Sequence, residues 1–286
     1  MGLNIQTLQL LKNSEDIKKG NLKVLTIGRQ AIRFGYKEFS KIEKNLNFSF
    51  NAFKESIKDS NGFCESLLKS LFGWDVESLD ISDYENCSYL HNMNQDIKEN
   101  KNLSNLIGRY DLILDLGSTE HIFNSTQSIV NSLNLLKKDG LLILSVPVTG
   151  TMEHGLYQFS QNFFDALSNS KFIKSNTSYY QQSKARGKLI SWEKLILFIE
   201  KTNLVIYSFA KIRKKNCFDE KEFKMGINDT YYEKVWNKTN MNTNKSRKIL
   251  RFLNKYISYN SKRNILKFMM SIPLINKYIA YSFYRI

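Results

Sequence analysis

The feature that most constrains the fold of this chain is a series of short strand-like runs, several of them mostly apolar, between longer segments of helical periodicity. Five runs have the length of strands, at 23–28, 76–81, 85–90, 110–116 and 141–146. Helices are expected at 3–19, 50–58, 62–72, 126–138, 160–168 and 191–202, and two last runs, 171–180 and 203–213, are expected to form an antiparallel pair. Apolar runs without strict alternation are typical of strands buried on both faces. The sequence therefore predicts an α/β fold with a doubly wound, mostly parallel sheet.

All three histidines of the chain follow such runs. His91 comes after the third run, His121 after the fourth and His154 after the fifth. In an open α/β sheet the carboxyl ends of parallel strands share one edge, and ligands bind in the crevice outside it. Imidazole is the side chain best suited to proton transfer near neutral pH. We therefore expect three imidazoles at one crevice, the alternative being structural histidines placed there by chance.

Composition limits the class of protein. The chain has 286 residues, of which 42% are hydrophobic, and no apolar run is long enough to span a membrane. The first 20 residues lack the apolar core of a secretory signal. The three cysteines, Cys64, Cys87 and Cys217, form neither a metal-binding spacing nor a disulfide framework. We therefore expect a cytoplasmic protein, and no metal ligands are predicted.

The net charge of +15 is concentrated at the end of the chain. After Glu233 there are twelve Lys or Arg and no acidic residue, whereas the first 233 residues carry 30 basic and 27 acidic residues. This shift predicts a domain at 1–215, which begins with the helix within 1–20, and a basic amphipathic helical region at 216–286. It argues against a nucleic-acid-binding core.

Three roles stay open for the basic region. Apolar residues recur at helical spacing in 246–259 and 263–271, with Lys and Arg beside them. Such helices can lie on an anionic membrane, which would make the protein peripheral to its inner face. They can also dock on the domain or on a second copy of the chain in a homo-oligomer, or bind an anionic polymer.

Polar residues follow the strands in a recognisable order. Gly28 ends the first run, Asp80 ends the second, Asn92 follows the third, and the stretch from 110 to 124 reads YDLILDLGSTEHIFN. Over roughly residues 20–213 this order resembles the class I S-adenosylmethionine-dependent methyltransferases. The resemblance implies a Rossmann-like fold, S-adenosyl-L-methionine as cofactor, and transfer of a methyl group to a small polar acceptor.

The resemblance also implies a set of cofactor-binding residues: Gly28, Arg29, Asp80, Asn92, Asp115 and Gly117. Asp80 matches the acid whose two oxygens accept from the ribose hydroxyls, and Asn92 matches a position that contacts the adenine amino group. The glycine-rich motif departs from the family, because Gln30 and Ile32 stand where its second and third glycines would be, and Thr26 stands for its acid. Side chains at these glycine positions are expected to obstruct the approach of a cofactor.

The predicted catalytic residues are His121, His154 and Glu120. Glu120 and His121 resemble the Glu-His pair of many small-molecule methyltransferases, and Glu153 and His154 repeat that pair after the fifth strand. A hydroxyl acceptor needs a base, so either imidazole is a candidate, with a neighbouring carboxylate orienting it. The simpler alternative for Glu120 is charge complementarity at a helix N-terminus, worth about 0.3–1 kcal/mol.

The loop after the fifth strand indicates the kind of acceptor. Its glycines, Gly150 and Gly155, suit a loop that covers the site, and Tyr157 and Phe159 are expected to supply apolar walls. This His-Gly-aromatic segment is similar to methyltransferases that modify sugars or surface polysaccharides. It implies O-methylation of a sugar, a nucleotide sugar or another polysaccharide precursor.

Two other classes of function stay open. One is a non-catalytic binding or scaffold protein on the same fold, because fold does not fix function. The other is a transferase with a nucleotide-linked donor, in which Arg29 and Arg33 meet a phosphate. In the leading interpretation the same arginines meet the carboxylate of the cofactor.

Overall fold

The computed structural model describes residues 2–14, 17, 20–42, 48–149, 154–182, 190–191, 206–215 and 218–226. The chain divides into two compact units, 1–228 and 229–286, and the second unit lies outside the described residues. The helix predicted at 191–202 lies almost wholly outside them as well, as do the predicted basic helices, whose proposed roles stay predictions. Within the described part of the chain, no helix has the length and apolar character needed to cross a membrane.

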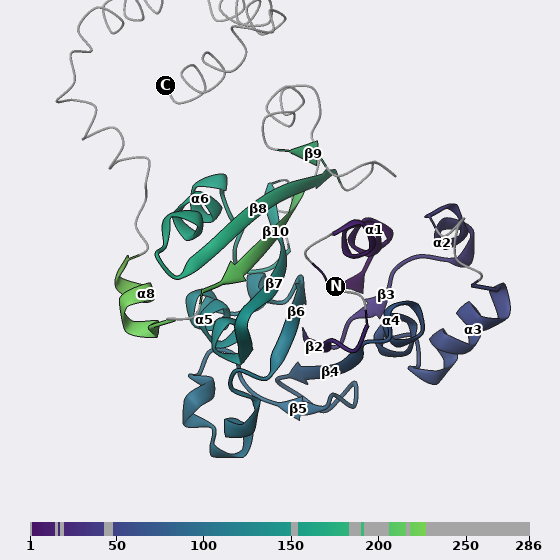
Figure 1. Cartoon of the computed structure of the whole chain (residues 1–286), viewed down its shortest axis with the longest axis horizontal. Coiled ribbons are helices and arrows are strands. Elements are labelled where there is room, and N and C mark those ends of the chain that lie inside the picture. The colour runs from purple at the N-terminus through teal and green to yellow at the C-terminus, as the bar shows by residue number, and fades with distance from the viewer. Residues whose placement is uncertain are drawn as a thin grey trace, which may run out of the picture. The chain divides into compact units, whose positions relative to one another are not determined.

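In the described part of the first unit, eight strands form one sheet with the order β5-β4-β2-β6-β7-β10-β8-β9. Its strands are β2 (Lys23–Ile27), β4 (Asp75–Asp80), β5 (Tyr89–Leu90), β6 (Tyr110–Leu116), β7 (Leu136–Thr149), β8 (Ile173–Gln182), β9 (Ile190–Ser191) and β10 (Ile206–Lys214). The strands from β5 to β7 are parallel, and β10 lies antiparallel between β7 and β8 (Figure 1). The predicted mostly parallel sheet and its closing antiparallel pair are therefore confirmed.

Helices cover both faces of this sheet (Figure 1). On one side lie α1 (Ile5–Asn13), α2 (Tyr36–Ile42), α3 (Phe50–Asp59) and α4 (Glu65–Phe72), and on the other α5 (Ser125–Leu135), α6 (Gln161–Asn169) and α8 (Glu220–Gly226). Each set packs on its own apolar core, and together the two cores enclose the apolar strands. This two-faced covering confirms the Rossmann-like, doubly wound architecture.

The central strand β6 shows why apolar runs were a sound guide. Leu112, Ile113 and Leu114 are each no more than 1% exposed, so both faces of the strand are buried. Tyr110 at its start is also buried, and its hydroxyl donates to Glu77 on β4 at 2.7 Å. Apolar residues are therefore required in the middle of this strand, and the buried Tyr110 hydroxyl at its start is satisfied by a neighbouring strand.

Three local features differ from the expectation, and the first is that the strand predicted at 85–90 is reduced to β5 (Tyr89–Leu90). The start of the predicted first helix is instead a short strand, β1 (Gly2–Leu3). It pairs in parallel with β3 (Ala31–Ile32), which follows β2 in the chain. The strand predicted at 141–146 already begins at Leu136, which shortens α5. The predicted Asp139–Gly140 turn is an irregularity inside β7, because the pairing with β6 shifts there and Asp139 has a φ of 56°.

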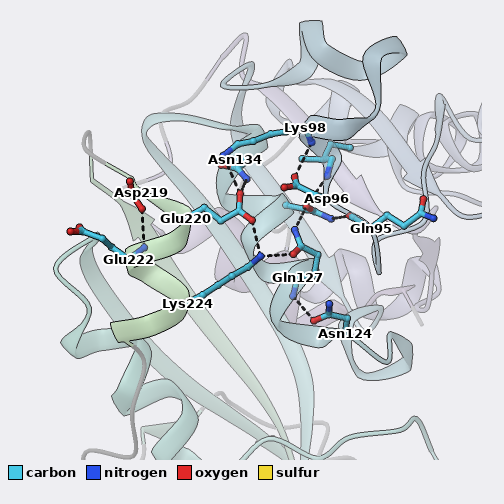
Figure 2. Close-up of polar contacts among 12 residues, drawn as sticks. Gln95, Asp96, Lys98, Asn124, Gln127, Asn134, Asp219, Glu220, Glu222 and Lys224 are labelled. Atoms are coloured by element: carbon cyan, nitrogen blue, oxygen red, sulfur yellow. Dashed lines mark hydrogen bonds and ion pairs between the residues drawn. The ribbon is translucent and has the colours of Figure 1, made fainter.

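A cluster of polar contacts ties helix α8 to α5 and so to the rest of the first unit (Figure 2). The Glu220 carboxylate accepts from Lys98 and Asn134 at 3.0 Å each and from Lys224 at 2.8 Å. Lys224 also donates to Gln127 at 2.6 Å. Burial raises the pKa of Glu220, but these donors outweigh burial and hold its pKa at about 2.

Candidate functional site

A pocket opens at the carboxyl ends of β2 and β4, where the sequence predicts ligand binding. Its lining is made of Ile27, Gly28, Leu79, Asp80, Ile81, His91, Asn92, Met93, Asn94, Ser118, His121 and Ile122. Four predicted site residues are therefore at one pocket, namely Gly28, Asp80, Asn92 and His121. The enclosed volume is about 220 Å³, below the roughly 300–1,000 Å³ of typical small-molecule pockets, so a larger ligand would extend into the open cleft.

Gly28 forms the turn at one wall of the pocket. Its φ is +71°, and its N–H donates to the carbonyl of Leu79 at 2.8 Å. A Cβ atom at this position would stand 2.8 Å from Ser118 Oγ and 3.7 Å from Asp80 Oδ2. Both the backbone conformation and the space therefore require glycine, and they leave the main chain bare beside Asp80.

Asp80 ends β4 and faces the Gly28 turn. Its Oδ1 accepts from the backbone N–H of Ile81 at 2.6 Å and of Ser82 at 3.4 Å. Those contacts fix the orientation of the carboxylate, whose Oδ2 is the oxygen nearest to the Gly28 position. The arrangement presents one anchored carboxylate to the pocket.

Asn92 lies at the same pocket with its carbonyl oxygen already engaged. Asn92 Oδ1 accepts from the backbone N–H of Asn94 at 3.0 Å and from its side-chain amide at 2.9 Å. An amide oxygen has two lone pairs, so both are used. As the turn stands, Asn92 would therefore meet a ligand as a donor, which does not suit the predicted contact with an adenine amino group.

Gln30, which replaces a family glycine, does not obstruct the pocket. Its side chain is 1% exposed and folds beneath the turn, where Nε2 donates to the carbonyls of Ile27 at 2.7 Å and Gly28 at 3.2 Å. Ile32 lies further on in β3, paired with Leu3. The expected obstruction at these two positions is therefore wrong, because neither residue lines the pocket.

Arg29, although next to Gly28, is turned away from the pocket. Its guanidinium pairs with Glu65 at 2.8 Å, donates to the carbonyl of Glu85, and lies 4.2 Å from the centre of the Phe63 ring. These contacts tie the turn to α4 and to the loop after β4. They correct the expectation that Arg29 meets a carboxylate or a phosphate in the pocket.

Asp115 and Gly117 likewise shape the site without lining it. Asp115 is 1% exposed and accepts from the Ser118 N–H at 2.8 Å and the Thr119 hydroxyl at 2.6 Å. Gly117 has a φ of 105°, which turns the chain after β6. The predicted cofactor contacts are thus corrected to a structural role: Asp115 caps the 3₁₀ turn η3 (Thr119–His121), which carries two candidate catalytic residues.

The three predicted catalytic residues form one cluster beside the pocket. Glu120 and His121 come from η3, and His154 comes from the chain that follows β7. Glu120 Oε1 lies 3.7 Å from His154 Nε2, and the His121 and His154 ring centres are 4.8 Å apart at nearly a right angle. The cluster therefore joins the end of β6 to the end of β7 across the sheet edge.

Two members of this cluster, Glu120 and His121, have shifted pKa values. Glu120 is 0% exposed, and burial followed by the nearby Asp115 charge raises its pKa to about 8. Burial, followed by His154, lowers the pKa of His121, which keeps that imidazole neutral near pH 7. A neutral imidazole at the pocket is in the form that can accept a proton.

The segment 154–159 is locked onto Glu120 by its backbone. The Glu120 carbonyl accepts from the N–H of Leu156 at 2.7 Å and of Tyr157 at 3.2 Å. Gly155 has a φ of 73°, and a Cβ there would lie 2.9 Å from Glu120 Cγ. Glycine therefore permits the contact that brings His154 into the cluster.

The expected apolar walls are only partly present. Tyr157 is half-buried, and its hydroxyl donates to the Phe123 carbonyl at 2.7 Å. Phe159 is in the core, 4.9 Å from the Phe163 ring centre, so its expected role as a wall is wrong. Phe123, which the sequence did not single out, is 77% exposed two residues after His121. Glu153 and Gly150 lie outside the described residues.

His91 lines the pocket but is held by its own loop. Its Nε2 lies 3.2 Å from the Gln95 carbonyl and its Nδ1 lies 3.4 Å from the Asn100 amide. Burial lowers its pKa. The expected convergence of three imidazoles is therefore met in position, but His91 serves the structure, and His121 and His154 remain for chemistry.

Sequence reasoning missed several pocket residues. Ser118, Met93, Asn94 and Ile122 line the pocket, and Ser118 Oγ donates to the Ile27 carbonyl at 2.5 Å. Ser118 bridges the ends of β6 and β2 in this way. Their position just after strand ends was the available signal, but residue type alone does not separate lining from core.

Comparisons with known proteins give similarity only to solved structures. No family model matches the chain, and no curated protein matches it. Similar structures include the CurJ carbon methyltransferase (11% identity, 74% of this chain and 53% of that chain, TM-score 0.38). Others are a phosphoethanolamine N-methyltransferase 2 of Haemonchus contortus with S-adenosyl-L-methionine (10%, 70% and 50%, 0.40) and the 1,6-didemethyltoxoflavin-N1-methyltransferase of Burkholderia thailandensis (13%, 69% and 72%, 0.35). The chain matches about half the length of the first two, and we base its function on the geometry of the site.

Proposed function

We propose that this chain is an S-adenosylmethionine-dependent methyltransferase that methylates a hydroxyl of a small polar acceptor. The observation that carries the proposal is the joining, at one sheet edge, of a bare glycine turn, an anchored carboxylate and a cluster with two imidazoles. Gly28 and Asp80 supply the first two, and the cluster meets them through His121, which lines the same pocket. This edge is where ligands bind in open α/β sheets.

The turn and the carboxylate fit the cofactor. A Cβ at position 28 would stand only 2.8 Å from Ser118 Oγ, so the turn must be glycine, and its bare main chain lies at the pocket wall with no side chain of its own to meet a ligand. Asp80 would accept hydrogen bonds from the ribose, because its orientation is already fixed by two backbone donors. When bound, S-adenosyl-L-methionine supplies a methyl group activated by a positively charged sulfur.

The imidazole cluster fits a hydroxyl acceptor, which must lose a proton. His121 lines the pocket and its pKa is lowered, so its imidazole can take that proton. His154 packs on its ring and limits the orientations open to it. Their shared position also restricts the acceptor to the mouth of the pocket, and positioning is the main demand of a displacement reaction.

Within this class we propose a sugar or a polysaccharide precursor as the acceptor. Sugars combine hydroxyls with apolar faces that pack on aromatic rings. Phe123 is 77% exposed beside the cluster, and Tyr157 is tied to its carbonyl. An exposed ring next to a proton acceptor suits such a molecule.

The proposal is tested by transfer of a labelled methyl group from S-adenosyl-L-methionine to a panel of sugars and nucleotide sugars. We expect one acceptor class to be labelled by the full chain and not by Asp80→Asn. Asp83→Asn is the matched control, since Asp83 is an exposed acid in the same loop that does not line the pocket. No labelling of any hydroxyl compound, or equal labelling by Asp80→Asn, would contradict the proposal.

A further inference from the structure

We propose that Glu120, His121 and His154 bind one divalent transition-metal ion beside the pocket. Each of the three side chains offers one ligand atom, and these atoms all lie within 4.8 Å of one another. The three residues come from two elements, η3 and the chain after β7, so the fold and not a local motif brings them together.

The state of the Glu120 carboxylate points to a missing ligand. The side chain is fully buried, and neither of its oxygens has a hydrogen-bond partner among the described residues. A buried carboxyl group whose oxygens have no partner is costly, whether charged or neutral. His154 Nε2 at 3.7 Å is beyond hydrogen-bond distance, so the imidazole does not satisfy it. A cation between Glu120 and the two rings would do so.

The surroundings hold this cluster as a built site. Two backbone N–H groups, from Leu156 and Tyr157, bind the Glu120 carbonyl, and Gly155 packs directly against Glu120 Cβ and Cγ. The main chain of Glu120 is thereby fixed, while the imidazole of His121 is exposed and that of His154 is partly exposed. With Glu120 held in place, rotation of the two imidazoles can bring all three ligand atoms around one ion.

The ligand types select the kind of ion. Two imidazole nitrogens and one carboxylate oxygen suit Zn²⁺, Co²⁺, Fe²⁺ or Mn²⁺, whereas Mg²⁺ and Ca²⁺ prefer oxygen ligands alone. Bonds of about 2.0–2.2 Å place ligand atoms no more than about 4.4 Å apart. The observed spread of up to 4.8 Å therefore requires a small inward rotation of the imidazoles.

Three protein ligands leave coordination positions open, as in catalytic metal sites. His121 also lines the pocket, so an open position would face the acceptor. An acceptor hydroxyl bound there would lose its proton to water more readily, and in the metal-loaded protein the imidazoles would act as ligands instead of proton acceptors. This catalytic role rests on the proposed function, whereas binding of the ion does not.

The test is titration of the chelator-treated full chain, without a polyhistidine tag, with Co²⁺ and with Zn²⁺. We expect one ion per chain, visible absorption of bound Co²⁺, and displacement of Co²⁺ by Zn²⁺. Affinity should fall by about 10–100-fold or more in Glu120→Gln and His154→Ala, because loss of supporting partners alone costs that much. His91→Gln, which removes the third histidine of the chain, should leave it unchanged.

A second measurement needs no variant. In the Co²⁺ protein, proton NMR should show strongly shifted exchangeable N–H signals from two histidines. Absence of saturable binding, or binding that survives both substitutions, would overturn the inference and show that Glu120 and His154 form only an ion pair. Metal-free protein that still binds S-adenosylhomocysteine would leave the proposed function standing while this inference fails.

Discussion

Two glutamates in this molecule, one fully buried and one partly buried, have opposite surroundings. Glu220, between α8 and α5, accepts hydrogen bonds from three side chains, and its pKa is held at about 2 (Figure 2). Glu120, at the sheet edge, has no hydrogen-bond donor among the described residues, and burial raises its pKa to about 8. The same residue type is thus charged and satisfied in one region, and unsatisfied in the other.

The difference separates structure from function. A carboxylate with a full set of donors fixes one element on another, as Glu220 fixes α8. A buried carboxylate without donors reduces stability, and such groups persist where a ligand or a reaction uses them. The two imidazoles that we assign to chemistry, His121 and His154, also lie in the Glu120 region.

The largest expected effect is on catalysis. His121→Ala and His154→Ala should lower methyl-transfer turnover by about 10²–10⁴-fold, because the first removes the proton acceptor and the second removes the ring that orients it. Glu220→Gln is the matched change in the other region and should leave turnover unchanged. Single-turnover rates at saturating cofactor measure this, and unchanged rates in both histidine variants would remove the cluster from the mechanism.

The free energy of unfolding should respond in the reverse order, with the larger loss for the substitution at Glu220. Glu220→Gln should lower the free energy of unfolding by about 1 kcal/mol, because the amide carries no charge to meet Lys98 and Lys224, which are both partly exposed. Glu120→Gln should cost little, since the carboxylate has no described donor to lose. Urea unfolding at pH 7 compares the two, and a larger loss for Glu120→Gln would break the contrast.

A backbone substitution tests how the site is held. Gly155→Ala should destabilise the protein by about 1–2 kcal/mol, because alanine must adopt a left-handed conformation and its Cβ would crowd Glu120. It should also weaken metal binding. Gly35→Ala is the control, because Gly35 lacks that conformation and a Cβ there meets nothing within 4 Å. Equal stability of the two variants would show that the loop is not packed on Glu120.

The smallest expected effect is a pH dependence in the α8 region. The folded pKa of Glu220 lies below its ordinary value of 4.5, at about 2. Its contribution to stability is therefore full above pH 4.5 and is lost as the pH falls towards 2. The difference in unfolding free energy between wild type and Glu220→Gln should narrow over that window, and a difference that stays constant would contradict the assigned charge.

Apolar patterning predicted the sheet well, because burial on both faces demands it. The run at 110–116 matches β6. Asp80 and Gly28 were predicted as site residues because they stand at strand ends, and both line the pocket. The two-residue strands β1 and β3 were not predictable, since two residues show no period. Side-chain direction was also beyond reach: Gln30 folds beneath the turn and Arg29 turns to Glu65, contacts that depend on partners distant in sequence.

Polar residues near the site were the hardest to assign. Asp115 and Glu120 lie five residues apart, and both are buried acids at the end of β6. One accepts from Ser118 and Thr119, and the other has no described donor. Nothing in their residue type or spacing distinguishes a capping carboxylate from one aimed at a ligand.

Calorimetric titration of the full chain with S-adenosylhomocysteine tests most directly whether the pocket between Gly28 and Asp80 is a cofactor site. Saturable binding of one molecule per chain is expected, with affinity sharply reduced in Asp80→Asn and retained in Asp83→Asn. No binding by the wild-type chain, or equal binding by Asp80→Asn, would contradict the account.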